Sequence, residues 1–173
     1  MLGPRRGSAE AFALAQRAAQ AQETVAVRGI VRTLVLTPRG PVEARAEMHR
    51  GADRVYIRYL SGPTAGMEVY RDDGTVWSRG PEGAAYHRTQ IADGDWSHEL
   101  MRRNWRVRLG GERRIAGRPA VLLTARGPGG RLTIVADRET GFPLVLKRSS
   151  PNGRLLSETV WETVDFSVGP PPP

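Results

Sequence analysis

The segment WRVRLGGERRIAGRPAVLLTARGPGGRLTIVADRETGFPLVLKRSSPNGRLLSETVWETVDF, residues 105–166, decides the fold, because strand-like runs alternate in it with strong turn signals. Trp105, Val107 and Leu109 alternate with arginines, which is typical of a strand with one buried face. We expect Gly110-Gly111 to end this strand. Further strands are predicted at 118–126, 131–137, 142–149 and, as one long strand, 154–166. Their short connections predict an antiparallel meander.

The first half of the chain predicts a helix followed by more strands of the same kind. Good helix formers fill Ser8–Gln22, with Ser8 as the expected N-cap and an alanine face that can pack closely against a sheet. A second helix is predicted at Asp93–Asn104. Apolar alternation predicts strands at 24–37, 42–49, 54–60, 67–71, 75–78 and 84–88. In the second of these strands, His49 falls on the charged, exposed side.

Glycine-containing turns punctuate the strands. Asp72-Asp73-Gly74 and Pro151-Asn152-Gly153 are hairpin signals, because Asn, Asp and Gly tolerate the positive φ of tight turns. A chain of 173 residues fits one domain, which we place at residues 8–168. Residues 1–7 are expected to be disordered or a linker, and the proline-rich tail 169–173 to be an extended terminator or linker.

Composition and charge narrow the possible functions. There is no cysteine, which excludes disulfides and thiolate chemistry. The net charge of +8 raises nucleic acid as a partner. However, the 26 basic residues, all arginine except Lys147, are spread along the chain and are not interleaved with aromatic residues. Nucleic acid is therefore disfavoured. The N-terminus lacks the apolar core of a signal peptide, and no run could span a membrane. Either the protein is cytoplasmic, or the sequence begins after a removed signal or anchor.

The sequence carries no pattern of an enzyme active site. It has no nucleophile elbow, phosphate loop or dinucleotide fingerprint, and its three histidines lack the spacing of a ligand pair. Asp93-Gly94-Asp95 lacks the other ligands of a calcium loop and is better explained as a helix cap. We therefore predict a protein that is not an enzyme and needs no metal or cofactor.

Two groups of residues remain as candidate binding residues. Large apolar side chains gather in the middle segment, and they either fill the core or line a cavity that accommodates acyl chains. These are Met67, Trp77, Tyr86, Trp96, Leu100, Met101 and Trp105. The densest arginine cluster either faces solvent or contacts anionic groups at the rim of such a cavity. Its candidate members are Arg102, Arg103, Arg106 and Arg108.

Three short sequence motifs of the C-terminal half, called words below, resemble a known family in their order and spacing. They are GRPAV at 117–121, DRETGFPL at 137–144 and NGRLL at 152–156. Together they resemble the N-terminal domain of the periplasmic sigma-factor regulatory proteins of the RseB/MucB family, over residues 106–166. The resemblance implies a LolA-like fold: an α+β but mainly β domain, with a strongly curved antiparallel sheet of about ten strands forming an unclosed half-barrel. Two helices are expected on its concave side.

The resemblance also implies a function. It indicates a periplasmic or extracytoplasmic domain that binds an acyl chain, lipid or lipoprotein and takes part in envelope-stress signalling, with an anti-sigma factor as partner. A signal or membrane anchor would then lie outside this sequence. Carriage of lipoproteins is the alternative within the same fold, and a protein-interaction or nucleic-acid-binding module is the alternative outside it. The family's smaller second domain has no counterpart before Pro173, so partner recognition through it is an open question.

Overall fold

The computed structural model describes residues 6–80, 87–90 and 106–172, and the chain divides into two compact units. Unit 1 comprises Met1–Gln22 and Asp95–Val160, and unit 2 comprises Glu23–Gly94 and Trp161–Pro173. All strand pairs within each unit are antiparallel. The described residues form one helix and eleven strands, so the prediction of a mainly β, antiparallel fold is confirmed. The helix predicted at 93–104 lies outside the described residues.

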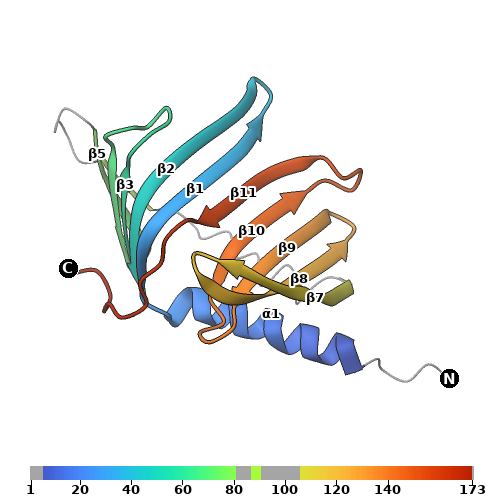
Figure 1. The fold of residues 1–173 in the computed structure, drawn as a ribbon. Helices are drawn as coiled ribbons and strands as arrows, with labels where there is room; N and C mark the ends of the chain where they lie inside the picture. Colours follow the sequence, from blue (N-terminus) through green and yellow to red (C-terminus); the bar gives the residue numbers. More distant parts are fainter. Residues whose placement is uncertain (1–5, 81–86, 91–105, 173) are drawn as a thin grey trace. The chain divides into compact units, whose positions relative to one another are not determined.

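Unit 1 is a meander with one helix (Figure 1). Its strands follow one another in space as they do in sequence, in the order β7-β8-β9-β10-β11. Their bounds are β7 Arg106–Ile115, β8 Arg118–Gly127, β9 Gly130–Asp137, β10 Pro143–Ser149 and β11 Leu155–Trp161. The four consecutive hairpins agree with the meander that the turn signals predicted.

Helix α1 (Arg6–Thr24) packs on one face of this meander through alanines. Ala11, Ala15 and Ala18 are buried with Leu123, Ile134 and other side chains of β7, β8 and β9. Small side chains at this spacing allow the helix to approach the sheet closely, as the alanine face predicted. Ser8 is not an N-cap, because the helix already includes Arg6 and Gly7. Helical residues up to Thr24 also displace the start of the first strand to Val27.

The Gly110-Gly111 pair does not end a strand, contrary to the prediction. β7 runs through both glycines to Ile115, and its register against β8 shifts between Leu109 and Glu112. The pair therefore forms an irregularity of the β-bulge kind, where the strand bends and pairing resumes. A Cβ on Gly110 would lie 2.6 Å from a methyl of Leu122, so the strand passes Leu122 here without room for a side chain.

Unit 2 is a second meander, with the order β6-β5-β4-β3-β2-β1. One face buries Val27, Val31, Ala46 and Val76. The bounds are β1 Val27–Thr37, β2 Gly40–Gly51, β3 Arg54–Tyr59, β4 Glu68–Asp72, β5 Thr75–Arg79 and β6 His87–Gln90. The hairpin predicted at Asp72-Asp73-Gly74 is present, with positive φ at Asp73 and Gly74.

The last strand is shorter than predicted, since β11 ends at Trp161 and not near Phe166. Beyond it the chain lies along β1 in unit 2. Glu162 donates its N–H to the carbonyl of Ile30 at 2.8 Å, and Asp165 forms an isolated antiparallel bridge with Arg28. The register of β11 against β10 reaches no further than Val160, opposite Val145, so these residues lie outside the regular pairing with β10. The chain then continues to the tail, Gly169–Pro172.

Candidate functional site

Four ring-bearing side chains lie in a row across unit 2. The strand registers place His49 opposite Tyr56, Tyr56 opposite Tyr70, and Tyr70 opposite Trp77. Residues directly opposite each other in antiparallel strands share a face of the sheet. The row therefore crosses β2, β3, β4 and β5 on one face, the one opposite to the buried Val76. We call His49, Tyr56, Tyr70 and Trp77 the aromatic row.

Neighbouring contacts hold the row in place. The rings of Tyr70 and Trp77 have centroids 5.8 Å apart and are inclined by 40°, which is a favourable tilted arrangement. Tyr56 donates its hydroxyl to a carboxylate oxygen of Glu68 at 2.6 Å, and Glu68 also lies 3.9 Å from Arg79. The hydrogen bond to Glu68, together with burial, raises the pKa of Tyr56 above its ordinary value. Tyr56 therefore stays a hydrogen-bond donor throughout the physiological pH range.

The proline-rich tail lies against this row. His49 Nε2 is 2.7 Å from the carbonyl oxygen of Gly169, and Tyr70 donates its hydroxyl to the carbonyl of Pro172 at 3.1 Å. Arg54 donates to the carbonyl of Pro171 at 3.3 Å, and the side chain of Pro171 is fully buried. The tail, expected to be a terminator or linker, is thus seated on β2, β3 and β4.

The row and the tail border an open hollow of about 560 Å³, which we call the aromatic groove. Its walls are predominantly apolar, with charged groups at Glu68 and Arg79. The lining residues are His49, Tyr56, Glu68, Val69, Tyr70, Trp77, Arg79, Pro171 and Pro172. A hollow of this size lies within the range of about 300–1,000 Å³ found for small-molecule sites.

The structure places only some of the predicted site residues. Trp77 lines the aromatic groove, whereas Met67 is half-buried in the turn before β4 and does not line it. Arg106 and Arg108 are exposed on β7 in unit 1. Their contact with an anionic group stays a prediction. The remaining candidates, Tyr86, Trp96, Leu100, Met101, Arg102, Arg103 and Trp105, lie outside the described residues.

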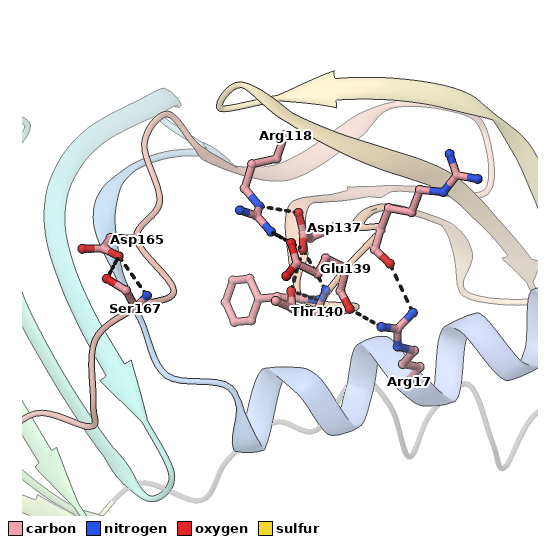
Figure 2. Close-up of polar contacts among 9 residues, drawn as sticks. Arg17, Arg118, Asp137, Glu139, Thr140, Asp165 and Ser167 are labelled. Atoms are coloured by element: carbon pink, nitrogen blue, oxygen red, sulfur yellow. Dashed lines mark hydrogen bonds and ion pairs between the residues drawn. The ribbon is translucent and has the colours of Figure 1, made fainter.

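A second cluster, in unit 1, joins two of the sequence words that carry the family resemblance. Arg118, from GRPAV, donates from Nε and a terminal nitrogen to the carboxylate of Asp137, from DRETGFPL, at 2.6 and 3.1 Å. Thr140 donates both its backbone N–H and its hydroxyl to the same carboxylate, at 2.9 and 2.8 Å (Figure 2). The side chain of Asp137 is 1% exposed. These four donors fix the turn between β9 and β10.

The same turn also binds the helix. Arg17 of α1 donates to the backbone carbonyls of Arg138 and Glu139 (Figure 2). Gly141 has a φ of +78° and lies so close to the Arg17 side chain that a Cβ would come within 2.8 Å of it. The Thr-Gly pair of the motif therefore supplies both a turn conformation and room for Arg17. We regard this cluster as the structural centre of unit 1 and not as a ligand site.

Burial alone would raise the pKa of Asp137, but the hydrogen bonds from Arg118 and Thr140 outweigh it and hold the pKa below its ordinary value. A carboxylate with a lowered pKa in the folded state stabilises the protein above the pKa of the unfolded chain, about 4. That stabilisation is lost as the pH falls through the lower folded-state value.

We accordingly expect the stability difference between the intact protein and an Asp137→Asn variant to narrow on acidification. Urea unfolding from about pH 6 down to about pH 3 measures it, because Asn cannot titrate and so lacks the linked loss. A difference that stays constant over this range would contradict the assignment of the lowered pKa to Asp137.

The described residues contain neither a metal-binding group of side chains nor a helix that could span a membrane. In the part of the chain that the structure describes, no three His, Asp or Glu side chains are grouped as a metal ion would require. The described helix is also not apolar and long enough to cross a bilayer. The walls of the aromatic groove are mainly apolar with a few polar groups, a combination that is suited to binding a small molecule.

No protein-family model and no curated protein matches the chain. The fold itself is nevertheless a known one, shared with solved structures over nearly the whole chain. It is the fold of MucB: the crystal structure of MucB matches with a TM-score of 0.70 and 23% identity, over 95% of this chain and 62% of MucB. The MucB-like fold implied by the three sequence words is thereby confirmed.

Other solved structures agree with this result. The complex of MucA and MucB from Pseudomonas aeruginosa matches with a TM-score of 0.67 and 23% identity, over 94% of this chain and 59% of the matched one. An uncharacterized conserved protein from Thermus thermophilus matches with a TM-score of 0.62 and 16% identity, over 91% of this chain and 87% of the matched one. The chain thus spans about three fifths of the MucB chains.

Proposed function

We propose that this chain is an extracytoplasmic domain that binds an acyl chain of a lipid or lipoprotein and regulates an anti-sigma factor in an envelope-stress pathway. The observation that carries the proposal is the aromatic groove, about 560 Å³ in volume, on a fold shared with MucB. MucB has been solved in complex with MucA, which supports a protein partner of that kind. Binding, and not catalysis, is the proposed activity.

The chemistry of the groove suits an acyl chain. Tyr70, Trp77 and the ring of Pro171 present apolar surface, and burying such surface stabilises a bound chain by about 25 cal/mol per Å². Arg79 at the edge can pair with a carboxylate or phosphate of the ligand. Apart from the aromatic groove, Met67, Tyr86, Trp96, Leu100, Met101 and Trp105 remain proposed apolar contacts of an acyl chain. Arg102, Arg103, Arg106 and Arg108 remain proposed contacts to anionic groups.

Native mass spectrometry with solvent extraction, on protein purified from a bacterial host, tests this proposal. We expect a co-purifying fatty acid or phospholipid, and a loss of at least about tenfold in its amount when Trp77 is changed to Asp. A charged carboxylate in an apolar wall opposes burial of the ligand. Circular dichroism should show that the variant is folded.

Val35→Asp is the matched control. Val35 lies on β1, is 40% exposed and does not line the groove, so this substitution adds the same charge to the same unit away from the site. It should leave the amount of co-purified lipid unchanged. Lipid-free protein that also fails to bind added acyl chains would refute the proposal, as would equal losses in the two variants.

A further inference from the structure

The contacts of the tail have the chemistry of proline-rich peptide recognition. Proline has no backbone N–H, so a run of prolines offers a partner only carbonyl acceptors and ring surface. The three sheet side chains that contact the tail all act as hydrogen-bond donors. His49, Arg54 and Tyr70 contact the carbonyls of Gly169, Pro171 and Pro172, respectively. Each of these three polar contacts therefore uses a group that a proline segment possesses.

The conformation of the tail follows from its sequence. The pyrrolidine ring fixes φ of Pro170, Pro171 and Pro172, and each residue that precedes a proline is restricted to extended or polyproline II conformations. A polyproline II segment has no internal hydrogen bonds, and its carbonyls point outward. Little conformational entropy is lost when such a segment binds, which is why aromatic-lined grooves commonly recognise it.

The surface also makes room for the tail. A Cβ on Gly51, at the end of β2, would lie 2.9 Å from the Cα and 3.1 Å from the Cβ of Pro170, so only glycine fits there without a shift. Pro171 is fully buried, although it belongs to a tail. Asp72, 3.6 Å from Arg54 Nε, orients the guanidinium that donates to Pro171. The missing side chain at Gly51, the burial of Pro171 and the ion pair between Asp72 and Arg54 thus all accommodate the tail.

We propose that the aromatic groove is a binding site for proline-rich, extended peptide segments, and that Gly169–Pro172 occupies part of it in cis. The tail contacts His49, Arg54 and Tyr70, and its Pro171 and Pro172 form part of the wall of a hollow that stays open. A longer proline-rich segment of a partner protein would make the tail's contacts and also fill this hollow. Such a segment can therefore displace the tail.

This inference goes beyond the lipid-binding function and does not depend on it. A cis segment has an effective concentration in the millimolar range, so the tail masks the site against short peptides of ordinary affinity. Replacing the prolines of the tail should expose the site. Lipid retention and peptide binding are measured in separate experiments. The lipid-binding proposal can therefore be refuted while the peptide-binding proposal stands, and the reverse.

Fluorescence anisotropy of fluorescein-labelled octaproline, titrated with delipidated protein comprising residues 1–173, tests the proposal. We expect a variant carrying P170S, P171S and P172S to bind octaproline at least about tenfold more tightly than the intact protein, because the cis competitor is weakened. Gly51→Ala, which crowds Pro170 without changing the prolines, is a second route to the same gain. A labelled glycine-serine peptide of equal length is the ligand control.

A hydroxyl deletion makes the test site-specific. In the triple-serine background, Tyr70→Phe removes the donor to the peptide carbonyl and should weaken octaproline binding about three- to tenfold. Tyr59→Phe makes the same change on β3 in unit 2, on the face opposite to the row, and should have no effect. The proposal is overturned if neither tail variant binds octaproline better than the glycine-serine peptide, or if the two Tyr→Phe changes act equally.

Discussion

Replacing Asp137 with alanine is expected to lower the free energy of unfolding by about 3 kcal/mol, because a buried carboxylate that accepts four hydrogen bonds is removed. The carboxylate is 1% exposed and accepts hydrogen bonds from Arg118 and Thr140. Its removal leaves the guanidinium and the Thr140 N–H without this acceptor. The turn that holds Arg17 of α1 would loosen as well, so part of the loss should be shared with the helix.

Urea unfolding at neutral pH measures this effect, and the same turn provides its control. Arg138 and Glu112 form an ion pair with an equally short N···O distance of 2.6 Å, but their side chains are 64% and 71% exposed. Exposed pairs contribute little, so Glu112→Ala should cost at most about 1 kcal/mol. If both alanine variants lost the same stability, burial of Asp137 would not be the cause.

The second large effect is expected at Gly29 on β1, where alanine should destabilise the protein by about 3 kcal/mol. A Cβ there would lie 1.9 Å from the backbone oxygen of Thr163. A backbone carbonyl cannot rotate away as a side chain can. Either β1 or the segment from Glu162 to Asp165 must therefore shift, and the hydrogen bonds that join them would be broken.

This substitution should also affect the tail, because the segment beside Gly29 leads directly to Gly169–Pro172. Thermal or urea unfolding gives the stability loss, and binding of labelled octaproline reports whether the tail has been released. Gly80→Ala is the control, since a Cβ at Gly80 meets nothing within 4 Å. It should change stability by no more than about 0.5 kcal/mol. A Gly29→Ala protein as stable as this control would contradict the close approach to Thr163.

Two of the three pairings in the aromatic row could be predicted from the sequence by counting residues across turns. Asp73-Gly74 forms a two-residue turn, which places Tyr70 opposite Trp77. Ala52-Asp53 does the same for His49 and Tyr56. Once the turn length is assumed, the register follows, because residues at equal distances from the turn face each other.

The third pairing and the contacts of the tail depend on tertiary structure. Tyr56 and Tyr70 are joined through the long connection 60–67, whose length leaves the register open. The tail reaches β2, β3 and β4 from more than a hundred residues away, and no local pattern encodes that contact. His49 was accordingly predicted as an exposed residue, although it is half-buried and bonded to Gly169.

The ends of two strands, β7 and β11, were predicted wrongly from local sequence propensity. Gly110-Gly111 is a strong breaker in isolation, but pairing with β8 on both sides carries β7 through it. The run after Asn152-Gly153 remains strand-like to Phe166, yet its pairing with β10 reaches no further than Val160. In both cases the extent of pairing with the neighbouring strand overrides the intrinsic preference of the residues.

The contact between Arg118 and Asp137 bears on how such chains can be classified. Two of the three sequence words that carry the family resemblance are joined to each other by an ion pair, while the aromatic groove lies in unit 2 and contains none of the three. A substitution at Asp137 would therefore act on the scaffold of unit 1, and a substitution at Trp77 on the proposed site in unit 2. The likeness carried by the words concerns architecture alone, so the proposed ligand has to be sought through His49, Tyr56, Tyr70 and Trp77.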